Sequence, residues 1–472
     1  MSKSYISSIS LAAVLIYISS GAALCTVHIN NIFTNNAVLQ QKIPIPVWGT
    51  ASNGETVTVS INGQSASTTA SSGKWRVNLP AMNAGGPYTM TIAGPSNTIT
   101  LTNIDIGEVW VASGQSNMDD VRVNMTKSGS LARLWPDDPH LRIVTGIPRI
   151  TSTTPLSEVS NTTTWTVDTK SVRGNFTGVG YYFGHKLREL LNVPVGIIWS
   201  ARGATGIEQW TDRKYTLDLG ISYYGEGTSY NYAEYYYSMI SPLQPYGIKG
   251  AVWYQGETHC NANQYYKALI AFTKCWRTDW GQGTFPFILV QIAPYGSVTG
   301  DNGWAEVREA DLIASRAIAR TSLALTIDVS DPAMIHPTNK EPVGVRVALA
   351  AMEDVYHKHH SNKESRKHLT PGPTYRSMSI NGNTATITFD NVGSGLTINS
   401  GTSLTGWIIA GPDKVWHNAT AEIRGNTVAV WSSEVTRPVA VRFGWWDAPA
   451  VNLCSVEGFP AAPFRTDCPI QN

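Results

Sequence analysis

Charged residues are scarce in this chain. Lys, Arg, Asp and Glu make up 15% of its 472 residues, and the formal net charge is +1. Nucleic acids and acidic membrane surfaces are bound through basic patches, so neither is an expected partner. Long apolar runs are also lacking, because no segment approaches the length of about 18 apolar residues that a membrane-spanning helix needs. The composition therefore argues against nucleic-acid-binding and membrane-spanning proteins.

The N-terminus has the features of a secretory signal peptide. Lys3 supplies a positive charge, Leu11–Ile18 is a short apolar segment, and small residues follow over 19–23. We predict that residues 1–25 are a signal peptide and that the mature protein is secreted or lysosomal.

Cysteine is rare, with five residues in the whole chain. In an oxidising compartment the simplest disulfides join sequence neighbours, Cys260 to Cys275 and Cys454 to Cys468, and buried free thiols are the alternative. Four Asn-x-Ser/Thr sequons would accept glycans in a eukaryotic secreted protein. They begin at Asn124, Asn161, Asn175 and Asn418.

The chain is too long for one hydrophobic core, so two or three domains are expected. Residues 26–105 carry short strand-like runs separated by turn signals at regular intervals, which predicts an N-terminal β-sandwich. Pro46 suggests that the first of these strands lies at an edge. The predicted strands are Ile45–Trp48, Thr56–Ile61, Lys74–Leu79 and Tyr88–Ile92.

Residues 106–370 alternate between strands and helices, which predicts an α/β fold with a parallel sheet covered on both faces. One helix follows His336, with Asn339 as its N-cap and Pro342 near its start. Other helical faces run over 179–190, 265–276 and 307–318, and the strands are Val195–Trp199, Gly250–Tyr254, Phe285–Gln291 and Leu323–Asp328.

Residues 371–472 again carry short strand-like runs separated by turns, which predicts a C-terminal β-rich region. Its strands are predicted over 384–389, 405–410, 428–431 and 439–443. The two β regions are either separate modules or pack together.

Functional residues of an open parallel sheet gather at the carboxyl ends of its strands. Ser116, Gly203, Gln255 and His336 each follow a predicted strand. Acyl transfer needs a hydroxyl, an imidazole and N–H donors for an oxyanion. We therefore predict a serine hydrolase with Ser116 as nucleophile and His336 as general base. The predicted oxyanion donors are the N–H groups of Gly203, Gln255 and Ser116.

The chain resembles the sialate O-acetylesterases, a branch of the SGNH-type serine esterases. The matching motifs are Ser113-Gly114-Gln115-Ser116-Asn117-Met118, Trp253-Tyr254-Gln255-Gly256-Glu257 and Ile335-His336-Pro337. Further matches extend the resemblance over nearly all of the mature chain. It implies an SGNH-hydrolase-like sheet and the same roles for Ser116 and His336. The implied reaction is hydrolysis of an acetyl ester through an acetyl-enzyme, and no metal or organic cofactor is implied.

The third member of the triad is the least determined. Many SGNH esterases carry Asp three residues before the His, where this chain has Ala333. Asp331 is the nearest upstream carboxylate and is the predicted partner of His336. Asp328 lies further off, and a backbone carbonyl is the alternative.

Further residues near the motifs are candidates for binding the oxyanion or the substrate. They are Gln115, Arg202 and Glu257. Arg202 is expected either to attract a sugar carboxylate or simply to pair with Glu208 or another acid.

The expected function is a secreted carbohydrate O-acetylesterase acting on O-acetylated sialic acid. One alternative is an acetylesterase for plant or microbial polysaccharide such as acetylated xylan, since the same machinery would serve. Another is a glycan-binding homologue with an inactive site, suggested by the two β regions and the 16 Trp residues. The expected partner is an O-acetylated sugar or glycan, and the oligomeric state is left open.

Overall fold

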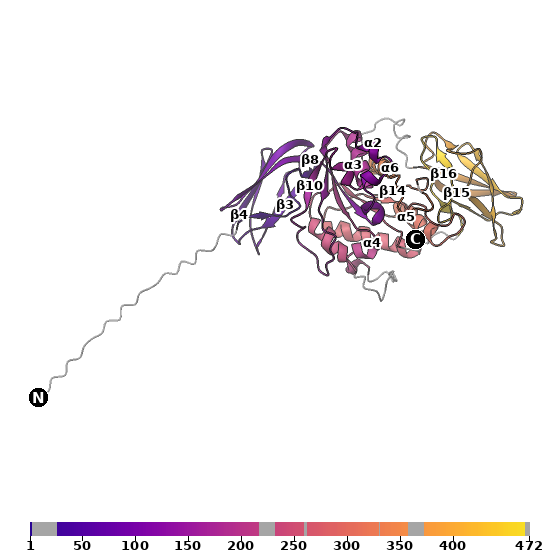
Figure 1. Ribbon diagram of the computed structural model, residues 1–472. Helices are drawn as coiled ribbons and strands as arrows, with labels where there is room; N and C mark the ends of the chain where they lie inside the picture. The colour runs from indigo at the N-terminus through magenta and orange to yellow at the C-terminus, as the bar shows by residue number, and fades with distance from the viewer. Residues whose placement is uncertain (2–25, 217–231, 259–261, 330, 357–371, 468–472) are drawn as a thin grey trace.

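The computed structural model describes residues 1, 26–216, 232–258, 262–329, 331–356 and 372–467. Residues 2–25 of the predicted signal peptide, as well as Cys260 and Cys468, lie outside the described residues. Figure 1 shows three parts in a row, with the N-terminal β region and the C-terminal β region at opposite ends of the central α/β part.

The N-terminal β region contains all four predicted strands. Alternate residues of β4 and β6 are buried, which places one face of each strand against a core. The sequence pattern missed β5 because its residues, Gln-Ser-Ala-Ser-Thr-Thr, carry almost no apolar signal. The strands are β1 (His28–Ile29), β2 (Val38–Gln40), β3 (Ile45–Thr50), β4 (Thr56–Ile61), β5 (Gln64–Thr69), β6 (Lys74–Leu79) and β7 (Gly85–Ala93).

The predicted edge position of β3 is wrong. The strand order is β1-β3-β6, so β3 is the middle strand. However, β1 pairs only with Thr50 and Gly49, so Pro46 has a strand partner on one side alone, Asn78 of β6. The missing N–H of proline is tolerated there for the same reason that it is tolerated at an edge.

A single long strand, β8 (Thr98–Gly114), joins the N-terminal region to the central sheet. Its first part pairs with β7, and its last part lies between β11 and β12. The predicted domain boundary at residue 105 therefore falls inside one strand. Buried residues of both regions also belong to one continuous core, for example Val57 and Val109.

The central sheet confirms the predicted parallel α/β fold. Its strand order is β10-β9-β11-β8-β12-β13-β14, and all neighbours from β9 to β14 are parallel. Within this order of described strands, β10 alone is antiparallel to its neighbour, at the edge beside β9. The strands are β9 (Asp138–Thr145), β10 (Thr164–Asp168), β11 (Val195–Ala201), β12 (Gly250–Tyr254), β13 (Phe287–Val290) and β14 (Thr321–Ala324).

Helices cover both faces of this sheet, with α3 and α6 on one face and α4 and α5 on the other (Figure 1). Side chains of β8 alternate between the two resulting cores, Val109 and Val111 in one and Trp110 and Ala112 in the other. The helices are α3 (Gly178–Leu191), α4 (Ala262–Trp280), α5 (Trp304–Ala317) and α6 (Glu341–Ala351). Pro342 lies in the first turn of α6 as predicted, but the N-cap is Lys340 and not Asn339.

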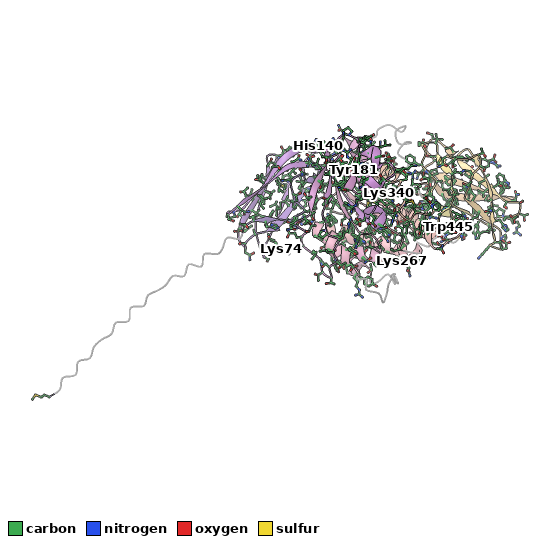
Figure 2. The ribbon with its side chains drawn as sticks, viewed as in Figure 1. Lys74, His140, Tyr181, Lys267, Lys340 and Trp445 are labelled. Carbon is green, nitrogen blue, oxygen red and sulfur yellow. The ribbon has the colours of Figure 1, made fainter. Side chains whose placement is uncertain are left out.

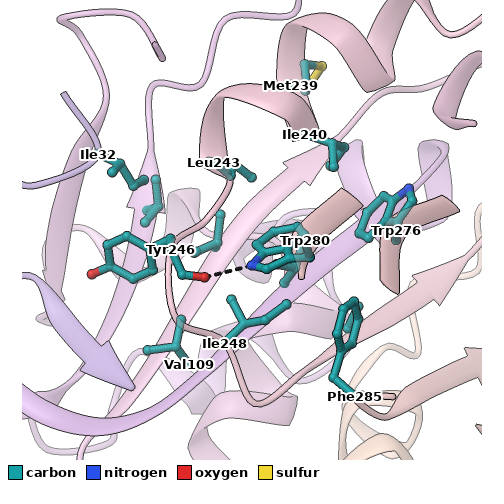
Figure 3. Packing of buried hydrophobic residues seen from close by; sticks show 14 of the residues in the cluster. Ile32, Val109, Met239, Ile240, Leu243, Tyr246, Ile248, Trp276, Trp280 and Phe285 are labelled. Carbon is teal, nitrogen blue, oxygen red and sulfur yellow. Dashed lines mark hydrogen bonds between the residues drawn. The ribbon is translucent and has the colours of Figure 1, made fainter. Parts of the chain in front are cut away.

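Large aromatic residues fill the core on the α4 side. Trp276 and Trp280 are buried, and the Trp280 indole N–H donates to the carbonyl of Tyr246 at 2.8 Å (Figure 3). Trp110, Trp165, Trp210 and Trp253 are also almost fully buried. The high Trp content thus largely reflects core packing, which weakens its value as a sign of glycan binding.

The C-terminal β region has a core of its own, and Ala462 also joins the core that runs from the N-terminal region through the α4 and α5 side of the sheet. It docks on α5, where the buried guanidinium of Arg308 donates to the carbonyls of Asp447, Trp446 and Gly444. Its strands are β15 (Thr374–Asn381), β16 (Thr384–Asp390), β17 (Leu396–Ile398), β18 (Trp407–Ala410), β19 (Trp416–Asn418), β20 (Thr420–Arg424), β21 (Thr427–Trp431), β22 (Ala440–Phe443), β23 (Leu453–Ser455) and β24 (Phe464–Arg465).

Cys275 and Cys454 are buried free thiols, which was the alternative to the predicted disulfides. Their predicted partners lie outside the described residues. The asparagines of all four sequons are exposed. Within the described ranges, no helix has both the length and the apolar character that crossing a membrane requires.

Candidate active site

Ser116 begins a one-turn helix directly beyond the carboxyl end of β8. The helix is α1 (Ser116–Asp119), and the Ser116 side chain is buried at 6% exposure. Gly114 makes the sharp turn possible, because its φ is +137° and an added Cβ would lie 2.1 Å from the carbonyl oxygen of Tyr254. No other residue type fits this position without displacing β12.

His336 lies in the loop between β14 and α6, at the same edge of the sheet. One side chain joins this loop to the serine turn. The Asn117 amide donates to the carbonyl of Ile335 at 3.0 Å, so the residue after the serine holds the residue before the histidine. The predicted nucleophile and base are therefore brought to one site from positions 220 residues apart in the sequence.

No hydrogen bond joins the Ser116 hydroxyl to the His336 ring, both of which are among the described residues. Catalytic hydrogen bonds often close only when substrate is bound. The structure thus places Ser116 and His336 at one edge of the sheet without a hydrogen bond between them.

The electrostatics of His336 favour a neutral ring. Burial lowers the pKa of His336 below its usual value, the nearby Lys340 ammonium lowers it further, and the Asp120 carboxylate opposes both. A neutral imidazole near pH 7 is the form that accepts a proton from a hydroxyl.

The structure does not bring Asp331 to His336. Asp331 is exposed, and its carboxylate accepts a hydrogen bond at 3.0 Å from the N–H of Ala333, within its own turn. Asp328 is also engaged elsewhere, in a two-point ion pair with Arg346 at 2.6 and 2.7 Å. The Asp120 carboxylate, one turn after the serine, raises the pKa of His336, although no hydrogen bond or ion pair joins these two described residues.

Two predicted oxyanion donors are engaged in holding the site together. The Gly203 N–H donates to the Asp119 carboxylate at 3.3 Å. The Gln255 amide donates to Gln115 Oε1 at 3.0 Å, and also to Thr205 and Thr258. Their role as oxyanion donors stays a prediction.

The Ser116 N–H and Gln115 Nε2 have no hydrogen-bond acceptor among the described residues. Gln115 Oε1 accepts from Gln255 Nε2 and from the Gly256 N–H, at 3.0 and 3.4 Å. These contacts fix the amide plane, so Gln115 Nε2 is on the side away from Gln255. The Ser116 N–H belongs to the first turn of α1, where N–H groups have no helical acceptor.

A buried network of charged groups lies behind the serine turn. Glu257 accepts from the Asn117 amide at 2.5 Å, and the Lys340 ammonium donates to Asn117 Oδ1. Burial raises the pKa of Glu257 and lowers the pKa of Lys340 to about 7. Figure 2 shows Lys340 within the central part of the molecule. Glu257 thus holds Asn117 in place, and its contact with substrate stays a prediction.

Arg202 is exposed just beyond the end of β11. Its backbone N–H donates to the Gly114 carbonyl at 3.1 Å. Its side chain forms no ion pair with Glu208 or with any other residue in the described part of the chain.

Sequence reasoning missed the supporting roles of Asn117, Lys340 and Asp120. All three stand within four residues of Ser116 or His336. Proximity in sequence to the two catalytic candidates was the only available signal, because the contact between the two loops is not visible in the pattern. Within the described ranges, no group of three or more His, Cys, Asp or Glu side chains could hold a metal ion.

A parallel sheet with a serine turn beyond β8 and a histidine loop beyond β14 defines a hydrolase of the SGNH type. Comparison with known proteins gives the family. Residues 106–352 match the family described as carbohydrate esterase, sialic acid-specific acetylesterase, and the chain belongs to this family.

Curated relatives and a solved structure agree with this assignment. Human sialate O-acetylesterase is 29% identical over 372 residues, which cover 69% of this chain and 70% of the human protein. The mouse sialate O-acetylesterase is 26% identical over 397 residues, covering 69% of this chain and 73% of the mouse protein. The crystal structure of a carbohydrate acetylesterase from Xanthomonas citri is 35% identical, with a TM-score of 0.85 over 94% of this chain and 100% of that chain. The chain is therefore an esterase, and the resemblance in its motifs is confirmed.

Proposed function

We propose that this protein is a secreted carbohydrate O-acetylesterase that removes acetyl groups from O-acetylated sialic acid. The observation that carries the proposal is the Asn117 bridge, which fixes the serine turn and the histidine loop together at one edge of the sheet. The acetylesterase activity named for the relatives supports the choice of an acetyl ester.

In the proposed mechanism, Ser116 Oγ attacks the acetyl carbonyl carbon while His336 takes the hydroxyl proton. The negative charge that develops on the carbonyl oxygen is held by the Ser116 N–H and by Gln115 Nε2, each donor being worth about 3 kcal/mol of barrier. The sugar hydroxyl then leaves with the proton from His336. Water, deprotonated by His336, attacks the acetyl-enzyme and releases acetate and free Ser116.

We assign to Asp120 the role first predicted for Asp331. A carboxylate beside the ring stabilises the imidazolium that forms in each half-reaction. The support is the electrostatic effect of Asp120 on His336, together with the engagement of Asp331 in its own turn.

The test measures acetate release from O-acetylated sialic acid. Ser116→Ala should lower kcat by about 10⁴-fold or more, and His336→Ala should behave alike. Ser130→Ala, an exposed serine in α2 (Gly129–Ala132), is the control and should match the wild type. Substantial turnover by Ser116→Ala, with a normal circular dichroism spectrum, would end the proposal.

A substrate panel tests the sugar separately. Wild-type kcat/KM is compared for acetylated sialic acid and acetylated xylan. A clear preference for xylan would replace the substrate while keeping the mechanism. Release from neither, combined with no labelling of Ser116 by a fluorophosphonate, would favour a glycan-binding homologue.

A further inference from the structure

A cavity of about 380 Å³ lies at the carboxyl edge of β9 and β11, beside the serine turn. Ala201, at the end of β11, lines the cavity and pairs with Gly114, two residues before Ser116. Arg149 lines the same cavity and forms an ion pair with Asp119 of α1. The cavity therefore has a direct structural link to both sides of the nucleophile turn.

The charge of this cavity is one-sided. The described residues that line it include Arg122 and Arg149 and no Asp or Glu. Arg149 is balanced by Asp119. Among the described residues, the Arg122 guanidinium has no ion-pair partner and donates a single hydrogen bond, to the Asn175 carbonyl at 3.0 Å. A guanidinium carries five N–H donors, so most of those on Arg122 are available.

The position of the two guanidinium groups is fixed by an aromatic ring. The Arg122 and Arg149 carbons Cζ lie 4.8 and 5.5 Å from the centre of the Trp199 ring. Stacking on an aromatic face holds a guanidinium in place without using its N–H groups. A fixed fork of N–H donors matches the two oxygens of a carboxylate.

The remaining lining suits a sugar. Thr145 and Thr166 contribute hydroxyls that are 3.0 Å apart, while Ile147 and Phe176 supply apolar surface. Sites for small polar ligands combine apolar walls with a few placed polar groups in this way.

We propose that this cavity is a subsite for the carboxylate of an acidic acetylated sugar, bound chiefly by Arg122 with Arg149 beside it. The inference rests on the proposed function and names the substrate class of the same site. A carboxylate of this kind occurs in sialic acids and in hexuronic acids, and the subsite orients either sugar so that its acetyl group reaches Ser116.

Binding is measured first, so that the result does not depend on turnover. Calorimetry compares O-acetylated sialic acid, its C1 carboxamide and an O-acetylated galacturonic acid on a Ser116→Ala background. The acidic sugar that binds more tightly, sialic or galacturonic, should bind about 10- to 100-fold more tightly than the neutral carboxamide. Arg122→Gln should abolish this preference for the carboxylate. Arg122→Lys should retain part of it, because the charge remains while the fork is lost.

Turnover is measured in the enzyme with Ser116 intact, as the ratio of kcat/KM for carboxylate and carboxamide. Arg76→Gln, an exposed arginine of β6, is the matched control and should preserve the ratio. Equal binding of carboxylate and carboxamide by the parent protein, or a preference that survives Arg122→Gln, overturns the subsite. Acetate release from both forms at equal rates would overturn it while leaving the acetylesterase proposal intact.

Discussion

Replacing Asn117 tests whether the connection between the two catalytic loops is essential. Its side chain makes three hydrogen bonds, to the Ile335 carbonyl, to the Glu257 carboxylate and from the Lys340 ammonium. Hydrogen bonds to charged groups contribute about 1.5–3 kcal/mol each and a neutral one about 1 kcal/mol. Because water can partly replace the lost contacts, Asn117→Ala should reduce the free energy of unfolding by about 3–5 kcal/mol.

The same change should also impair catalysis. Without the bond to Ile335, the loop carrying His336 is no longer fixed against the serine turn, and a displacement of about 1 Å can cost about 100-fold in kcat. Asn117→Asp separates size from hydrogen bonding, because it keeps the shape but cannot donate and places a second carboxylate against Glu257. It should be at least as damaging as Asn117→Ala.

Stability is followed by guanidinium unfolding with Trp fluorescence, and activity by acetate release. Asn383→Ala, at an exposed position beside β16, is the control and should change stability by less than about 0.5 kcal/mol. Wild-type stability together with wild-type kcat in both Asn117 variants would refute the reasoning.

Three other changes follow from the site. Asp120→Asn should lower kcat by about 10- to 100-fold and move the acid limb of the kcat/KM profile to lower pH, because a carboxylate that raises the pKa of His336 is removed. Asp331→Asn should change neither kcat nor the pH profile. If Asp331→Asn has the larger effect, Asp331 is the partner of His336. The pKa of Lys340 is about 7 in the folded protein, below its value in the unfolded chain, so above pH 7 the unfolded chain binds one proton more than the folded protein. The free energy of unfolding of the wild type should therefore rise with pH, relative to that of Lys340→Met, by up to about 1.4 kcal/mol per pH unit. Plots of unfolding free energy against pH that run parallel for the two proteins between pH 7.5 and 9.5 would contradict this. Gly114→Ala should destabilise by about 3 kcal/mol or more, whereas Gly281→Ala, which also has positive φ but open space around it, should cost only about 1 kcal/mol in the same unfolding assay.

The sequence predicted much of the fold because its strands and helices carry clear periodicity. The predicted strands Thr56–Ile61, Lys74–Leu79 and Gly250–Tyr254 match the observed bounds. The polar strand β5 was missed, and the boundary at residue 105 was drawn through β8. The change in the sequence pattern marks where helices begin along the chain. It does not show that β8 pairs with strands of both the N-terminal β region and the central sheet.

The candidate site was predicted only in part. Ser116 and His336 were predicted because acyl transfer requires their residue types beyond strand ends, and the structure places both at one edge of the sheet. The role of Asp331 was chosen by distance along the chain, whereas the side chains around His336 are set by the packing of α1 against the loop before α6. Likewise, Gln255 and Gly203 were predicted as oxyanion donors, but their N–H groups have acceptors within the protein that no spacing reveals.

The continuity of β8 limits how the polypeptide can be shortened. The segment that matches the family begins at residue 106, in the middle of this strand. A fragment starting there would lose the pairing of Val38–Gln40 with residues 105–107 and would expose the edge that β2 and β7 normally cover. Uncovered strand edges recruit other chains. Recombinant fragments for crystallisation or domain exchange should therefore retain residues 26–105, because the matched segment shares a strand and a hydrophobic core with them.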